Sequence, residues 1–154
     1  MTLGKGSYEL DFDAAIGATA LGAEATKDHS DLLLVDFVVE YEDRYLFVEI
    51  LEPDGGDAQE RLRSDALCER LARMYRDSMF FHSFGDRQPK AVEYAVLHTL
   101  PGIDETLVFV LQDELRRRIP LSHPVWKEDS AASCSVMTVE QWKKRYGNDA
   151  VRAS

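Results

Sequence analysis

The sequence predicts an α+β protein, α/β in the broad sense, with a central mixed β-sheet flanked by helices. Three features predict it: a strand hairpin over residues 32–51, a long helical stretch after it, and an apolar strand over residues 91–99. A helix between two strands is a crossover long enough for parallel pairing, and such crossovers are right-handed. A chain of 154 residues, 45% of them apolar, can bury one core, so we expect a single domain over residues 1–154.

The first third of the chain predicts one short strand, one short helix and the hairpin. Residues 8–12 alternate apolar and acidic side chains, which is typical of a strand. Residues 14–23 are small and apolar and predict a short helix, which two glycines weaken. Residues 32–41 and 45–51 are the strands of the hairpin, and Glu42 and Asp43 form its turn.

A long helix and a second strand are expected after the hairpin. Asp57 is a good N-cap for one helix over residues 58–84. The apolar strand over residues 91–99 follows it. Asp104 then caps a helix that ends at about Arg118.

The C-terminal part predicts a strand over residues 133–137 and a last helix. Thr138 and Gln141 have the spacing of a capping box, which begins the helix, and Gly147 ends it.

The charge of the chain bears on its partners and its location. It has 18 Lys and Arg against 28 Asp and Glu, a net charge of −10, so bulk electrostatics do not favour nucleic acid or an anionic membrane. No apolar run is long enough to span a bilayer, and residues 1–6 lack the pattern of a secretory signal. We therefore expect a cytoplasmic protein without a membrane partner, in which Cys68 and Cys134 are reduced.

Two acidic residues lie inside the hairpin. A turn at Glu42 and Asp43 places Asp36 directly opposite Glu49. Side chains alternate between the faces of a strand. One face carries the core residues Leu33, Val35, Phe37, Val39, Leu46, Val48 and Ile50, and the outer face carries Leu34, Asp36, Val38, Phe47, Glu49 and Leu51. The two acids therefore lie in the middle of an apolar patch.

Such a pair needs compensation. Two charges about 5 Å apart repel by roughly 3 kcal/mol at an effective dielectric of 20. A divalent cation such as Mg²⁺ would offset this, because carboxylates, waters and substrate phosphates are its usual ligands. A bound proton would also offset it, as would a separate bonding partner for each acid, such as an Arg or a helix N-terminus. The residues alone leave these three alternatives open.

The hairpin resembles the core of a known superfamily. Asp36 is separated by 12 residues from Glu49-Ile50-Leu51, and a helix and a further strand follow. This arrangement is similar to the restriction-endonuclease-like, or PD-(D/E)xK, superfamily, whose core is a hairpin, a crossover helix and a parallel strand. The resemblance covers about residues 32–99, and the chain after Thr99 is similar to small bacterial proteins that carry this core.

The resemblance implies a metal-dependent phosphodiesterase, with Asp36 and Glu49 as catalytic residues and as ligands of Mg²⁺ or Mn²⁺. In that chemistry the ion activates water and a lysine positions the nucleophile. Leu51 stands in the place of the lysine and supplies no positive charge. Some members move the basic group to a neighbouring element. The candidates here are Lys27, Gln59 and Arg63, the last two because the following helix begins beside the site.

Three functions follow from these observations. The first is a nuclease-fold protein with a degenerate, catalytically impaired site, a pseudoenzyme that binds a protein or nucleic-acid partner. The second is an active Mg²⁺- or Mn²⁺-dependent nuclease with a relocated basic residue. The third is an unrelated α/β regulatory or interaction protein in which the acids are structural. Superfamily members often dimerise, so the resemblance also implies a homodimer. Under the first two functions, Asp36→Asn without metal is expected to be neutral or stabilising, because it relieves the repulsion.

Overall fold

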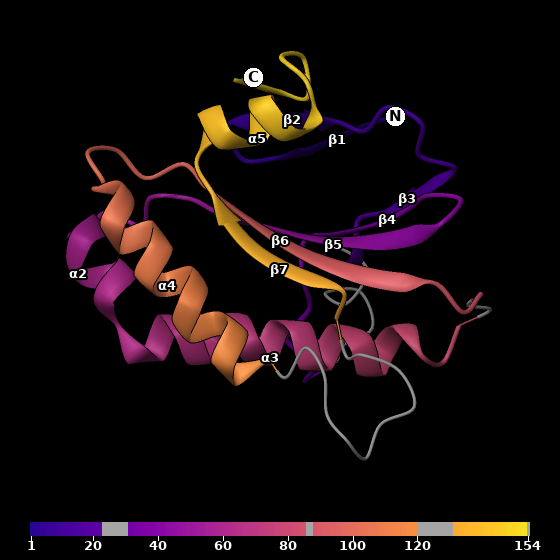
Figure 1. Cartoon of the computed structure of the whole chain (residues 1–154), viewed down its shortest axis with the longest axis horizontal. Helices are drawn as coiled ribbons and strands as arrows, with labels where there is room; N and C mark the ends of the chain where they lie inside the picture. The colour runs from indigo at the N-terminus through magenta and orange to yellow at the C-terminus, as the bar shows by residue number, and fades with distance from the viewer. Residues whose placement is uncertain (23–30, 86–87, 120–130, 154) are drawn as a thin grey trace.

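A five-stranded mixed sheet forms the centre of the molecule (Figure 1). The structure is a computed structural model, and it describes residues 1–22, 31–85, 88–119 and 131–153. Its strands, in spatial order, are β3 (Gly17–Thr19), β4 (Phe37–Glu40), β5 (Arg44–Leu51), β6 (Ala91–His98) and β7 (Ser133–Met137). Strand β4 pairs antiparallel with β3 and with β5, whereas β5, β6 and β7 are parallel to one another. The predicted mixed sheet, with its hairpin, crossover and parallel strand, is confirmed.

Different elements cover the two faces of this sheet (Figure 1). Three helices cover one face: α2 (Ala58–Arg63), α3 (Asp65–His82) and α4 (Glu105–Arg118). The other face is covered by α5 (Val139–Tyr146) and a three-stranded antiparallel sheet of β1 (Thr2–Lys5), β2 (Tyr8–Asp11) and β8 (Val151–Ala153). No helix among the described residues is long and apolar enough to cross a membrane.

Both faces of β5 are therefore buried. Phe47 and Leu51 belong to the apolar cluster beneath the helices, whereas Leu46 and Val48 belong to a second cluster with Trp142 of α5. The prediction that one face of the hairpin is an outer surface is wrong. Helices α3 and α4 bury it, because an apolar sheet face is removed from water when helices pack on it.

The hairpin's first strand is shorter than predicted and begins only at Phe37. The backbone N–H of Val35 donates to Ser78 Oγ (2.9 Å), and that of Leu33 donates to Asp77 Oδ2 (2.9 Å). These two backbone N–H groups donate to side chains of α3, so they are not available for hydrogen bonds to a neighbouring strand. Val35 consequently packs beneath the helices and not on the face that its spacing predicts.

The long helix predicted over residues 58–84 is two helices that meet at Ser64. The backbone of Ser64 is extended, and its hydroxyl accepts a hydrogen bond from the N–H of Leu67 (3.4 Å). Serine competes for backbone donors in this way, so it ends one helix and caps the next.

Other differences lie near the chain ends. The helix predicted over residues 14–23 is wrong at residues 17–19, which form β3, and β1 and β8 are not predicted. Each of these strands has three or four residues, so only its pairing with distant strands defines it. The strands predicted near residues 8–12 and over 91–99 are confirmed to within one residue. The strand β7 and the helices α4 and α5, with the N-caps of both helices, are also confirmed.

Candidate functional site

The two acids of the hairpin meet where β4 begins. The register of β4 and β5 pairs Phe37 with Val48, as predicted, so Asp36 is the next position beyond the ladder and lies beside Glu49. The backbone N–H of Asp36 donates to Glu49 Oε2 (3.0 Å). The N–H of Ile50 donates to Asp36 Oδ2 (2.8 Å), so a carboxylate bonds to β5 where the ladder stops.

A lysine from the other sheet reaches the same point. Lys5 is the last residue of β1, and its Nζ atom lies 2.7 Å from Asp36 Oδ2 and 3.4 Å from Glu49 Oε1. It also donates to the backbone carbonyl oxygen of Ile50 at 3.0 Å. One ammonium group thus satisfies three oxygen atoms that face it. We call Lys5, Asp36 and Glu49 the triad.

The turn after β1 holds the lysine in place. Gly6 has a φ of +57°, a left-handed conformation that suits glycine. A Cβ atom at this position would displace the carboxylate of Glu52, whose Oε1 accepts a hydrogen bond from the N–H of Ser7. The left-handed backbone of the turn therefore favours glycine after Lys5.

Burial and charge set the protonation of the triad. The Glu49 side chain is 6% exposed and that of Asp36 is 15% exposed. Burial, and then the charge of Asp36, raise the pKa of Glu49 from 4.5 to about 8, against the opposing effect of Lys5. Burial alone would lower the pKa of Lys5, but the charges of Glu49 and Asp36 outweigh it and raise that pKa. Burial and the neighbouring charge thus favour the protonated form of Glu49, whereas the acidic neighbours favour the charged form of Lys5.

A cavity of about 430 Å³ opens beside the triad. Lys5, Glu49 and Leu51 form its wall on the sheet side, and Arg61 and Arg70 reach it from the helices. The guanidinium group of Arg61 is already engaged, because it donates to the carbonyl oxygen of Glu52 and lies 3.3 Å from Asp54 Oδ2. Arg70 is exposed at the cavity.

Two of the three residues predicted to replace the motif lysine do not line the cavity. Gln59 and Arg63 of α2 are exposed and do not line the cavity. Helical periodicity explains this, because Arg61 lies between them and points to a different face of α2. Lys27 lies outside the described residues. The assignment of catalytic or metal-binding roles to Asp36 and Glu49 stays a prediction. Among the described residues there is no group of three or more His, Cys, Asp or Glu side chains that could hold a metal.

Lys5 was missed because its contact with the acids is long-range. It precedes Asp36 by 31 positions, and the short strand that carries it has no clear period. Its one local signal is the run Gly4-Lys5-Gly6, in which a lysine stands between two residues that permit close backbone approach. That signal indicates a turn, not a partner for the lysine.

Comparison with known proteins gives one structural likeness. No protein family model matches the chain, and no curated protein sequence matches it. Among solved structures, the chain is similar to the small subunit of the heterodimeric restriction endonuclease R.BspD6I, with 17% identity and a TM-score of 0.40. The match covers 75% of this chain and 47% of that subunit, so the chain spans about half the subunit's length.

Proposed function

We propose that this chain is a nuclease-fold protein in which Lys5 holds the place of the catalytic metal ion, so that the protein is catalytically impaired and acts by binding a protein or nucleic-acid partner. The convergence of three oxygens on Lys5 Nζ carries the proposal. Two carboxylates and a backbone carbonyl are ligands that Mg²⁺ or Mn²⁺ accepts. The same three acceptors match the three donors of an ammonium group.

The donor set fits a divalent ion only if Lys5 moves away. A bound ion would supply Lewis acidity and lower the pKa of a water molecule. An ammonium group at the same point supplies one positive charge and no open coordination position. Leu51 adds no base or donor on this side of the cavity. With Lys5 in place, the site therefore lacks the means to activate water.

One observation favours a second function. The Lys5 side chain is 34% exposed and lines the cavity, so it has room to swing outward. In that position it would be the relocated basic residue of an active nuclease, beside an ion held by Asp36 and Glu49. The two functions differ in what happens when Lys5 is removed.

Titration of Mn²⁺ by calorimetry at pH 7.5 tests the proposal. We expect no Mn²⁺ binding by the wild-type chain and clear binding by Lys5→Ala, in which the oxygens are left without a cation. Lys90→Ala is the matched control, because Lys90 Nζ also contacts a carboxylate, Glu40 Oε1 (2.7 Å), and a carbonyl, that of Tyr41 (2.8 Å), but only one acid. This control should not gain binding.

Cleavage of plasmid DNA and of an RNA substrate with Mn²⁺ separates the two functions. No cleavage by the wild-type chain supports the proposal. Wild-type Mn²⁺ binding, together with cleavage that Lys5→Ala abolishes, overturns it in favour of the active nuclease. Absence of Mn²⁺ binding in both the wild-type chain and Lys5→Ala overturns both and leaves the acids with a structural role.

A further inference from the structure

The lysine of the triad comes from an edge strand that buries little surface. β1 lies at the border of the small sheet, and among the described residues β2 is the one strand that pairs with it. Thr2 and Gly4 are exposed, and Leu3 and Lys5 are half-buried. Leu10 of β2, in contrast, is fully buried. Detachment of β1 would therefore leave the buried part of the small sheet in place.

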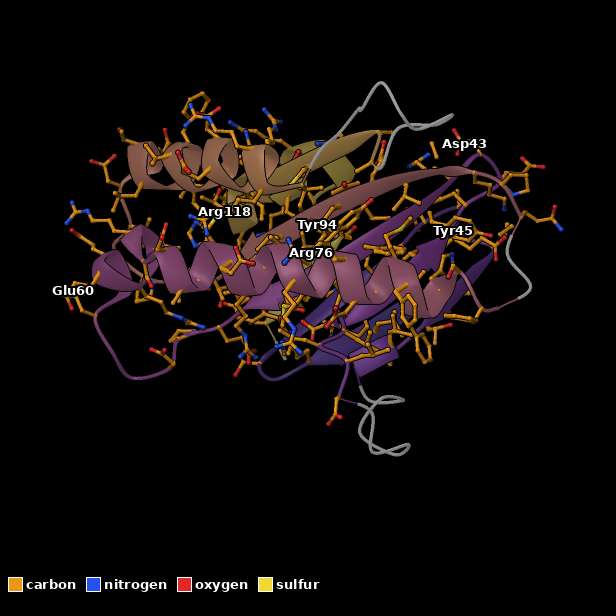
Figure 2. All side chains as sticks on the ribbon, turned by 90° about the horizontal axis from the view of Figure 1, so that it is seen from below. Asp43, Tyr45, Glu60, Arg76, Tyr94 and Arg118 are labelled. Carbon is orange, nitrogen blue, oxygen red and sulfur yellow. The ribbon has the colours of Figure 1, made fainter. Side chains whose placement is uncertain are left out.

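β1 also lies away from the helices. Figure 1 shows β1 and α3 on opposite sides of the central sheet. Figure 2 shows the helix side, where Arg76 of α3 and Arg118 of α4 lie in front of the sheet. Arg118 forms an ion pair with Asp65 of α3, so these two helices are joined without a contribution from β1. The strand can therefore detach while the central sheet and its helices stay folded.

Lys5 fastens β1 to the central sheet. Its ammonium group donates to Asp36 Oδ2 (2.7 Å) and to the carbonyl oxygen of Ile50 (3.0 Å). Earlier in the strand, Leu3 packs against the apolar cluster that contains Trp142. The group that occupies the oxygens of the site is thus also one of the groups that hold the strand. Attachment of β1 and occupation of the site by Lys5 are one state of the molecule.

We propose that β1 is a releasable strap that places Lys5 between Asp36 and Glu49 and withdraws it when the strand detaches. This regulation rests on the proposed function, because it applies to the oxygens that a divalent ion would bind. The ion and the ammonium group exclude each other. A divalent ion therefore favours the detached strap, and the attached strap opposes the ion by the same factor.

Hydrogen exchange along β2 measures the release of the strap. The N–H of Phe12 donates to the carbonyl of Met1, on the β1 side (2.9 Å), and the N–H of Asp11 donates to that of Ala150, on the β8 side (3.0 Å). Alternate N–H groups point the same way, so that of Leu10 also faces β1. After correction for intrinsic rates, Leu10 and Phe12 should exchange at least about tenfold faster than Asp11. Equal exchange overturns the strap and leaves the proposed function standing.

Calorimetric titration with Mn²⁺ at pH 7.5 tests whether release opens the site. Leu3→Asn removes an apolar contact of β1 and leaves the triad unchanged. We expect this variant to bind Mn²⁺, as Lys5→Ala does under the proposed function, and to exchange the β1-facing N–H groups of β2 faster than the wild-type chain. Thr2→Asn is the matched control, because Thr2 is exposed on the same strand, and it should behave like the wild-type chain.

A disulfide between β1 and β2 provides the opposite test. Gly4 faces Glu9 in the ladder, and both are exposed. A Cβ atom at Gly4 would lie 3.7 Å from Glu9 Cγ, an ordinary contact. Facing residues of an antiparallel pair have Cα atoms about 4.5–5.5 Å apart, within the range that a disulfide spans. Gly4→Cys with Glu9→Cys, added to Leu3→Asn and oxidised, should abolish Mn²⁺ binding, and reduction should restore it.

The outcomes separate the strap from the proposed function. Mn²⁺ binding by Lys5→Ala but not by Leu3→Asn overturns the strap and leaves the proposed function in place. Undiminished binding by the oxidised disulfide variant also overturns the strap. Absence of binding by Lys5→Ala overturns the proposed function, and the strap with it. Circular dichroism confirms that each variant is folded, and Leu3→Ala replaces Leu3→Asn in all three measurements if the asparagine variant does not fold.

Discussion

The Nζ atom of Lys5 lies 2.7 Å from Oδ2 of Asp36, although 31 positions separate the two residues in the chain. Lys5 ends β1 in the small sheet, and Asp36 precedes β4 in the central sheet. Their ion pair therefore joins the two sheets at the point where the hairpin ladder stops. The same contact supplies a positive charge to the pair of Asp36 and Glu49. The sequence predicts that these two acids lie together but does not identify the cation between them.

Asp36→Asn is predicted to destabilise the protein without metal by roughly 1–3 kcal/mol. Under the two nuclease-fold functions the sequence predicts a neutral or stabilising effect, from relief of repulsion, and under the third function it predicts a loss of stability. The structure favours a loss of stability, because Asp36 Oδ2 accepts hydrogen bonds from Lys5 Nζ and from the N–H of Ile50. Urea denaturation in EDTA measures the change.

Asp113→Asn is a suitable control for that measurement. Asp113 forms an exposed i,i+4 ion pair with Arg117 on α4, and such pairs contribute little. We expect a change within about 0.5 kcal/mol. A neutral or stabilising effect of Asp36→Asn would contradict the contact with Lys5.

Stability is predicted to fall as the pH rises from 4.5 to about 8, and Glu49 is the cause. Burial and the charge of Asp36 raise the pKa of Glu49 from 4.5 to about 8 in the folded protein. Between these values the folded state binds more protons than the unfolded state, so the free energy of unfolding decreases with pH. The contribution is fully present below 4.5 and lost above about 8.

Glu49→Gln isolates this effect, because glutamine cannot ionise. Urea denaturation at pH 5, 6.5 and 8 should show that the wild-type chain loses more stability than the variant over this range, at up to about 1.4 kcal/mol per pH unit. Glu52→Gln is the neighbouring control and should keep the wild-type slope. Parallel pH profiles for the wild-type chain and Glu49→Gln would show that Glu49 is ionised throughout.

Local signals were sufficient for most of the central sheet and its helices. The capping box of Thr138 and Gln141 and the N-cap of Asp104 act within one turn, so their positions follow from spacing. The hairpin register follows from its turn. The late start of β4 does not follow, because it depends on side chains of α3 that bond to residues 43 or 44 positions away. The break at Ser64 is a local cap, in which the Ser64 hydroxyl accepts from the N–H of Leu67, but the predicted helix runs through it.

In the candidate site, too, local signals predict some contacts and long-range packing determines the others. Asp36 and Glu49 come together through the hairpin register, which alternation and turn position determine. Lys5 reaches them because the small sheet packs against the central sheet. The sequence around Asp36 does not predict that packing. Gln59 and Arg63 are predicted because the following helix begins beside the site, but the direction of a helical side chain decides whether it reaches a cavity.

Thr138→Ala is predicted to lower the free energy of unfolding by about 1 kcal/mol. The Thr138 hydroxyl accepts from the N–H of Gln141 (3.1 Å), and the Gln141 side chain accepts from the N–H of Thr138 (2.9 Å). Without the hydroxyl, the N–H of Gln141 at the start of α5 has only water as an acceptor. Thermal or urea denaturation measures the effect, and Thr138→Ser, which keeps the hydroxyl, should restore most of the stability. An unchanged Thr138→Ala variant would mean that α5 is held by the packing of Trp142 alone.

Leu51→Lys, the change that rebuilds the motif lysine, is predicted to give no cleavage by itself. Leu51 lines the cavity, so the ammonium group of a lysine at this position can extend into the cavity. Lys5 still donates to the oxygens of Asp36 and Glu49 that a metal ion needs. The double variant Lys5→Ala, Leu51→Lys removes the competing ammonium and supplies the missing base on the motif strand. We expect Mn²⁺-dependent cleavage of plasmid DNA only in the double variant, and its loss when Asp36→Ala is added. Circular dichroism confirms folding of each variant before the assay. Cleavage by Leu51→Lys alone would show that Lys5 leaves the oxygens when metal is offered, and would place Lys5 outside the position of the ion.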